Sequence, residues 1–261
     1  MVAGPRRQNA APLGLARQPR DPVTPMLTLP FSVPEAALTD RESRDLSRLT
    51  REVGGIWLRA ADGQPEGWPA ATDPDAIALP VAEAPVFAPH RTRAALRLTT
   101  GENRGFRLPD AVPDPSRWSA AILWAADEPA LALLAVRPER GGNPLHLSDT
   151  EEGLVFRDDD GTASATLPRG QGPWRLTVLA CADGRLTLAQ DGRQASAQGL
   201  RVPPGAAHLL VGHRSLRRGM RKTLGAGRIA GVWLWPGLDI LSDAEAAALR
   251  GALDGFRQWE V

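Results

Sequence analysis

Residues Trp174–Ala197 read WRLTVLACADGRLTLAQDGRQASA, which is three short β-type runs separated by two Asp-Gly pairs. An Asp-Gly pair between such runs is the strongest short signal for a β-hairpin, because a type I′ turn needs positive φ at both central residues. We therefore predict a meander of three strands at Trp174–Ala182, Arg185–Gln190 and Arg193–Ala197.

The pattern of short runs bounded by turn residues continues on both sides of this meander. The other runs, given as residue ranges, are 55–60, 95–99, 105–108, 118–125, 131–137, 145–147, 154–157, 209–212 and 228–235. Many short strands at even spacing are typical of a β-sandwich or a jelly roll. The sequence therefore predicts an all-β domain.

The N-terminal part of the chain differs from this β-rich part. Residues 1–33 contain six prolines, which exclude a continuous helix, and a segment of this composition cannot bury enough apolar surface to fold alone. We expect an extended docking arm at 1–33 that attaches the chain to a larger partner. Its basic residues are Arg6, Arg7, Arg17 and Arg20.

Helical spacing of leucines predicts one helix over 34–53, and a capping box at Ser242 and Glu245 predicts a short C-terminal helix. Between them, residues 61–92 form a proline-rich stretch that we interpret as an ordered loop or a linker, because prolines are excluded from sheet interiors. The expected organisation is thus an arm at 1–33, a helix at 34–53, a β domain at 54–253 that includes loop 61–92, and a C-terminal tail at 254–261.

Composition excludes several classes of protein. The net charge is only +1, so the overall charge gives no reason to expect binding to nucleic acid. A single cysteine, Cys181, excludes an intrachain disulfide and a Cys-rich zinc site, and its apolar neighbours indicate a buried thiol. No stretch reaches the roughly 18 apolar residues of a membrane span, and residues 1–20 lack the apolar core of a secretion signal. We therefore expect synthesis in the cytoplasm without a signal peptide, and no membrane insertion.

The sequence resembles the concanavalin A-like, laminin-G-like jelly-roll domains. The meander at Trp174–Ala197 is similar to the central hairpins of that family, His208–Gly212 (HLLVG) to the strand that follows, and Gly227–Leu249 (GRIAGVWLWPGLDILSDAEAAAL) to its closing segment. The earlier strands are matched by Gly55–Leu58, Ala95–Pro109 and Trp118–Trp124. The resemblance covers about three-quarters of the chain, residues 54–253. It implies the fold, but the family includes lectins, adhesion modules, glycosidases, lyases and virion fibre domains, so it does not fix the function.

The carboxylates do not form a catalytic pattern. Glycosidases need an acid and a nucleophile about 5–5.5 Å apart, which alternate positions of one strand supply. The nearest group, Asp149, Glu151 and Glu152, lies in a predicted loop and is interpreted as a solvated charge run. The family's lyases commonly use a tyrosine, and the chain has none. We expect that the protein is not an enzyme.

The sequence gives only weak evidence for a metal site. Asp158, Asp159 and Asp160 precede Gly161 and could offer oxygen ligands to Ca²⁺, but they do not have the spacing of a known calcium motif, so an ordinary acidic turn is the preferred interpretation. We expect no cofactor, with Ca²⁺ as the one alternative.

The strongest candidate for ligand or partner binding is the loop His213–Lys222 (HRSLRRGMRK). It contains no acid, and its arginines match the oxygens of a carboxylate, a phosphate or an acidic partner; the alternative is a solvated loop. Most tryptophans lie on predicted strands and are expected in the core, whereas Trp68 and Trp259 lie in a loop and in the tail. The predicted binding residues are Arg214, Arg217, Arg218, Arg221, Trp68 and Trp259.

Three functional hypotheses remain open. The favoured one is a non-enzymatic attachment protein: a head spike or fibre of a phage-like particle or gene transfer agent, which binds a host surface polysaccharide. The resemblance implies this role, and with it an extracellular site of action, an oligomeric assembly and a spike-base partner for the arm. The alternatives are a purely structural virion component and a carbohydrate-active enzyme of the same fold.

Overall fold

The computed structural model describes residues 35–90, 93–128, 131–139, 143–202, 204–214 and 225–260, with the side chains at 35–43, 90 and 257–260 left out. Residues 35–261 belong to one compact unit. The expected docking arm, with Arg6, Arg7, Arg17 and Arg20, lies outside the described residues.

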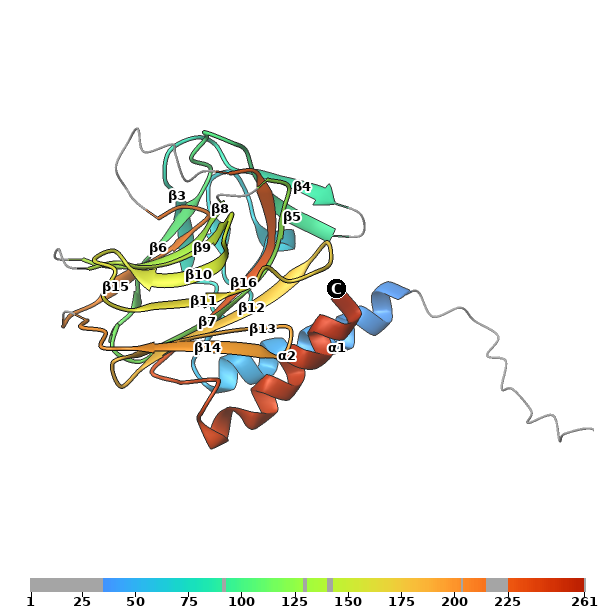
Figure 1. The fold of residues 1–261 in the computed structure, drawn as a ribbon. Helices are drawn as coiled ribbons and strands as arrows, with labels where there is room; N and C mark the ends of the chain where they lie inside the picture. Colours follow the sequence, from blue (N-terminus) through green and yellow to red (C-terminus); the bar gives the residue numbers. More distant parts are fainter. Residues whose placement is uncertain are drawn as a thin grey trace, which may run out of the picture. The chain divides into compact units, whose positions relative to one another are not determined.

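Two antiparallel sheets form the centre of this unit (Figure 1). The first sheet has the strand order β14-β13-β12-β7-β16-β5-β4, and β1 also pairs with β16. Its strands are β1 Ile56–Arg59, β4 Val86–His90, β5 Arg93–Leu98, β7 Trp118–Ala126, β12 Arg175–Ala182, β13 Arg185–Gln190, β14 Arg193–Gln198 and β16 Gly227–Pro236.

The second sheet has the order β11-β10-β9-β8-β15-β6-β3-β2. Its strands are β2 Trp68–Pro69, β3 Ile77–Pro80, β6 Phe106–Val112, β8 Leu131–Pro138, β9 Leu145–Thr150, β10 Gly153–Asp158, β11 Ser164–Leu167 and β15 Ala207–Val211. All twelve predicted β runs fall on strands, and the predicted all-β sandwich is confirmed.

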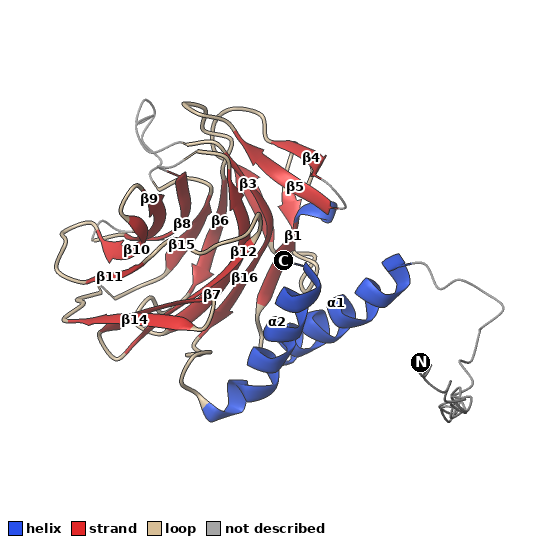
Figure 2. Ribbon diagram, turned by 45° about the vertical axis from the view of Figure 1, so that its right-hand side comes forward, coloured by secondary structure: helices blue, strands red, loops and turns tan. Residues whose placement is uncertain are grey.

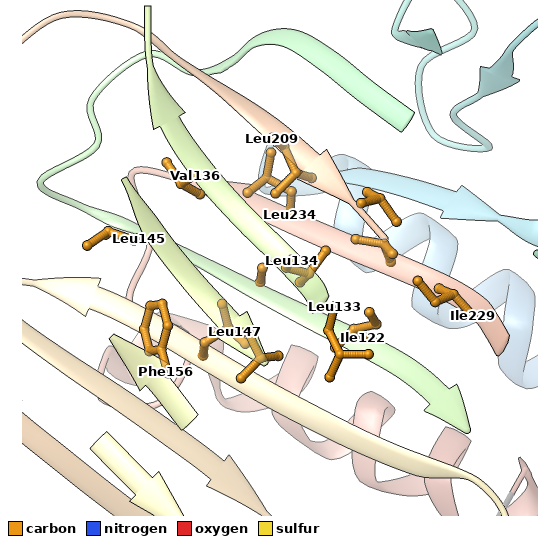
Figure 3. Close-up of a cluster of buried hydrophobic side chains, with 14 of the residues drawn as sticks. Ile122, Leu133, Leu134, Val136, Leu145, Leu147, Phe156, Leu209, Ile229 and Leu234 are labelled. Carbon is orange, nitrogen blue, oxygen red and sulfur yellow. The ribbon is translucent and has the colours of Figure 1, made fainter. Parts of the chain in front are cut away.

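The space between the sheets is filled by alternate residues of both. Figure 3 shows Val136, Leu145, Leu147 and Phe156 of the second sheet among these buried side chains. Cys181 is fully buried in the same core, as predicted, and burial raises the pKa of its thiol to about 12. The thiol therefore stays protonated and unreactive at neutral pH.

Two helices cover the outer face of the first sheet (Figure 2). They are α1 Glu35–Glu52 and α2 Ala247–Glu260, and short 3₁₀ turns lie at Ala60–Asp62 and Ala244–Ala246. A second apolar core, which includes Leu46, Trp233, Trp235 and Phe256, fills the space between helices and sheet. Neither described helix has the length and apolar character needed to span a membrane. Helices and core together bury both faces of the central strands β7, β12 and β16, whereas the edge strand β14 is largely exposed.

Three details differ from the sequence-based expectations. The proline-rich stretch 61–92 is not only loop: it supplies β2, β3 and β4 at the sheet edges, where a missing N–H is tolerated. The expected tail 254–261 is helical as far as Glu260. The capping box does not form, because Asp243 precedes the 3₁₀ turn and its carboxylate accepts from the backbone N–H of Asp239.

The two Asp-Gly turns have the predicted backbone. Asp183 and Gly184 have φ of 52° and 68°, and Asp191 and Gly192 have φ of 51° and 74°, so both residues of each pair are left-handed as in a type I′ turn. The three-strand meander is confirmed, because β12 pairs with β13 and β13 pairs with β14.

We expect Gly192→Ala to destabilise the fold by about 1 kcal/mol, the cost of placing a Cβ residue in the left-handed region. No atom lies within 4 Å of an added Cβ, so the cost comes from the backbone alone. Urea unfolding measures it. The matched variant Gly255→Ala, which adds a Cβ to open space in α2, should instead leave stability equal or raise it; equal loss in both variants would contradict the turn assignment.

Candidate functional site

No described helix covers the outer face of the second sheet, because both described helices lie against the first sheet, on the other side of the sandwich (Figure 2). Strand register defines which side chains share this face. Ala135 on β8 pairs with His146 on β9, His146 pairs with Arg157 on β10, and Arg157 pairs with Ser164 on β11. Since directly paired residues point to the same side of a sheet, this row faces away from the core.

The row continues across β15 and β6. Leu210 on β15 pairs with both Ala135 and Arg107, and Arg137 pairs with His208, so Arg107 and Arg137 face outward too. We call the outward-facing set Arg107, Arg137, His146, Ser148 and Arg157 the polar face. From β6 to β10 it crosses four strand spacings, or about 19 Å.

A hollow of about 470 Å³ lies over β9, β10 and β11 on this face. Leu131, Ala132 and Val155 supply an apolar part of its wall, and most of the other lining residues have polar side chains: His146, Ser148, Thr150, Glu151, Glu152, Arg157, Thr166 and Arg214. The Ser148 hydroxyl is buried and has no hydrogen-bond partner. A polar hollow with an unsatisfied hydroxyl is suited to a hydrogen-bonding ligand, because a buried polar group without a partner costs free energy.

His146 is held neutral beneath this hollow. Its Nε2 accepts a hydrogen bond of 3.2 Å from Nε of Arg157, which places the ring proton on Nδ1. That Nδ1 is buried without a hydrogen-bond partner, 3.7 Å from a carboxylate oxygen of Asp159. Burial, together with the charges of Arg214 and Arg157, lowers the pKa of His146 to about 4. At neutral pH it therefore offers an N–H donor and no charge.

The arginines of the polar face, and Arg214 in the wall of the hollow beside it, have no carboxylate partner among the described residues. Among the described residues, Arg107, Arg137, Arg157 and Arg214 form no ion pair, whereas other arginines, such as Arg169, do. All four are partly or fully exposed to solvent. Their guanidinium groups are thus available to an external anion.

Asp149 lies at one side of the hollow, but its carboxylate faces inward. It is fully buried, and Oδ1 accepts a 2.8 Å hydrogen bond from Arg169. Burial raises its pKa, while the hydrogen bond from Arg169 opposes that shift. Its expected role as part of a solvated charge run is therefore wrong, whereas Glu151 and Glu152 are exposed as expected.

The predicted binding residues are only partly brought together. Arg214 lines the hollow, while Arg217, Arg218 and Arg221 lie outside the described residues. The expectation for Trp68 is wrong: it is fully buried in the core, where its indole N–H donates to the backbone carbonyl of Arg59. Trp259 lies in α2, and its side chain is not among those described.

Hydrogen bonds within the protein stabilise the acidic turn at Asp158, Asp159 and Asp160. Asp158 is buried, and its two oxygens accept from Ala163 and Asn143, while the backbone N–H groups of Asp159 and Asp160 donate to Asn143. Within the described ranges, no three His, Cys, Asp or Glu side chains gather into a possible metal site.

Sequence reasoning missed all five residues of the polar face, Arg107, Arg137, His146, Ser148 and Arg157. A local signal exists on β9, where His146, Ser148 and Thr150 alternate with the core residues at 145 and 147. It shows that this strand has a polar side, but not which strands lie beside it.

Solved structures show similar folds. The Trypanosoma rangeli sialidase in complex with sialic acid aligns over 86% of this chain and 40% of its own, with a TM-score of 0.59 and 16% identity. The same sialidase in complex with 2,3-difluoro-KDN aligns over 84% of this chain and 39% of its own, with a TM-score of 0.57 and 14% identity. Mouse laminin α1 chain domains LG4-5 align over 61% and 46%, with a TM-score of 0.43 and 15% identity.

At these identities the likeness concerns the fold alone, and the chain spans about two-fifths of the length of the sialidases. The fold itself is the predicted all-β sandwich of two antiparallel sheets. No protein-family model matches the chain, and no curated protein matches it.

Proposed function

We propose that the chain is a non-enzymatic attachment module that binds a carboxylate-bearing surface polysaccharide along the polar face. The observation that carries this proposal is a group of arginines, Arg107, Arg137, Arg157 and Arg214, that form no ion pair with any described residue and lie on or beside the hollowed face. A guanidinium matches a carboxylate with two parallel hydrogen bonds, and this contact is stronger than one between neutral groups.

The shape of the polar face favours a polymer over a single sugar. The face extends about 19 Å across the strands, and the hollow adds the hydroxyls of Ser148, Thr150 and Thr166, which suit sugar hydroxyls as donors and acceptors. Sialic acid, which the similar sialidase holds in its complex, is itself a carboxylate-bearing sugar.

The attachment role on a particle is the more specific part of the proposal. It assigns the domain to a head spike or fibre of a phage-like particle or gene transfer agent, with the arm at 1–33 as the docking segment. It rests on the sequence resemblance given above, and it is tested by whether the protein sediments with such particles.

The binding test compares two double variants of equal charge change. Arg137→Gln with Arg157→Gln removes two cations of the polar face, and we expect about tenfold weaker binding to polygalacturonate, since two contacts of about 0.7 kcal/mol each correspond to that factor. Isothermal titration calorimetry measures it. The matched control is Arg193→Gln with Arg201→Gln, two exposed arginines outside the polar face, and it should bind as the wild type does.

Salt dependence, a neutral polymer and the length of the polysaccharide after binding distinguish the attachment role from the enzymatic and the purely structural alternatives. Binding should weaken with added salt, because the Debye length falls from about 10 Å at 0.1 M to 3 Å at 1 M, and neutral dextran should not bind. Equal affinity in the two double variants would place the site elsewhere. A falling polymer length would favour the enzyme alternative, and no binding to any charged polymer would favour a purely structural component.

A further inference from the structure

A second cavity, of about 190 Å³, lies on the other side of the molecule, between the first sheet and α2. Trp57 on β1, Gly231 and Trp233 on β16 and Phe256 on α2 contribute to its walls, with Arg59 and Arg93 also lining it. Both helices lie over this sheet, and the C-terminal end of α2 lies close to β1 and β16 (Figure 2). The cavity is thus separate from the polar face.

Its walls are aromatic. The rings of Trp57 and Trp233 are stacked with centroids 5.4 Å apart, and Phe256 meets them edge-on at 6.3 and 5.3 Å. Such an arrangement offers both ring faces and ring edges to an inserted ring, and aromatic pairs add to the free energy of burial.

Two indole N–H groups in this aromatic cluster have no acceptor. Nε1 of Trp57 and Nε1 of Trp233 are both buried and make no hydrogen bond. Buried tryptophans usually find a partner for this group, and an unsatisfied buried donor costs free energy. An acceptor from a bound molecule would remove that cost.

Gly231 keeps open the space next to one of these donors. A Cβ at this position would lie 3.3 Å from Nε1 of Trp57 and 3.2 Å from a ring carbon of Trp233. The absence of a side chain at Gly231 therefore leaves room beside the indole nitrogen of Trp57 and the ring of Trp233, which an added methyl group would fill. Arg59 pairs with Gly231 across the strands and stands beside the same space.

The charge at the cavity is positive. Arg59 is paired with Asp62, at 2.8 Å, but Asp62 does not line the cavity, and none of the described lining residues is acidic. Burial lowers the pKa of Arg93 to about 10, so it remains charged at neutral pH. The cavity therefore combines an apolar interior with a positive side and an unsatisfied donor.

We propose that this cavity binds a small aromatic carboxylate, with its ring against Trp57, Trp233 and Phe256 and its carboxylate toward Nε1 of Trp57 and Arg93. The size fits one ring, since an apolar cavity of about 150 Å³ binds benzene. The carboxylate supplies acceptors for the buried indole N–H and a negative charge for the arginines.

The test uses 4-fluorophenylacetate as the probe and the full chain as the protein. We expect its ¹⁹F resonance to broaden and shift with the wild-type protein at millimolar concentration. Gly231→Ala should weaken this binding about tenfold, because the new methyl group takes up room in the cavity beside Trp57 and Trp233. The matched control Gly251→Ala, whose Cβ enters open space on α2, should bind as the wild type does.

A second variant keeps the test decisive if Gly231→Ala folds poorly. Arg93→Gln should weaken binding of 4-fluorophenylacetate severalfold and leave binding of the neutral analogue 4-fluorotoluene unchanged. No binding to the wild-type protein, equal binding to Gly231→Ala in a folded state, or equal loss of both probes in Arg93→Gln would each overturn the proposal. None of these results depends on polysaccharide binding at the polar face.

Discussion

Replacing Phe156 by alanine should destabilise the fold by about 3–5 kcal/mol, the range for deleting a buried aromatic ring and leaving a cavity. Phe156 on β10 is 1% exposed and packs edge-on against Trp118 of the opposite sheet, with ring centroids 6.1 Å apart. The ring therefore joins the two sheets, and neighbouring side chains cannot close the gap without moving a strand. Equilibrium unfolding in urea measures the loss.

The adjacent residue provides the control. Val155 is half-buried and lines the hollow on the outer face, so Val155→Ala should cost less than about 1.5 kcal/mol, because a smaller group leaves a site that solvent already reaches. Similar losses at the two positions would mean that β10 does not have one core side and one outer side, and the polar face would be wrongly assigned.

The difference between these neighbours shows what the sequence can predict. Strand positions follow from local patterns, and the Asp-Gly turns predict even the order of β12, β13 and β14, because a hairpin joins strands that are consecutive in the chain. The pairing of β8 with β15, or of β15 with β6, joins segments about 70 to 100 residues apart, and no local pattern specifies it.

The candidate site depends on those distant pairings. Arg107, Arg137 and Arg157 are far apart in the sequence and form one row only after β15 is placed between β6 and β8. The predicted site relied instead on a cluster that is local in sequence, His213–Lys222, of which Arg214 reaches the hollow. The prediction that Trp68 is an exposed binding residue is wrong for the same reason. Its ring is covered by residues of other strands, including Phe87 on β4 and Phe106 on β6.

The second large effect is expected at the ion pair between Arg169 and Asp149. Asp149 is 0% exposed and Arg169 is 35% exposed, with 2.8 Å between Nε and Oδ1. Arg169→Met should destabilise the fold by about 3 kcal/mol at pH 7, because removing one partner leaves a buried charge uncompensated. The value is at the lower end of the usual range, since Arg169 is partly solvated and Arg175 also acts on Asp149.

The pH dependence of this loss has a definite sign. The pKa of Asp149 is raised by burial in the folded protein, so this group contributes most to stability below its unfolded pKa of about 3.9, and the contribution is lost as the pH rises through the folded value. Without Arg169 the folded pKa rises further. The cost of Arg169→Met should therefore be small near pH 4 and grow toward pH 7, which urea unfolding at a series of pH values measures.

A double-variant cycle isolates the charge as the cause. In an Asp149→Asn background no buried carboxylate is left without its partner. Adding Arg169→Met should then lower the free energy of unfolding by less than about 1 kcal/mol at pH 7. This loss should not change between pH 4 and pH 7. The hydrogen bond from Arg169 to the backbone carbonyl of Thr150 is lost in both backgrounds and cancels in the cycle. If Arg169→Met costs the same with and without the Asp149 carboxylate, the arginine stabilises the fold through packing and that backbone contact, and the buried charge is compensated by Arg175 alone.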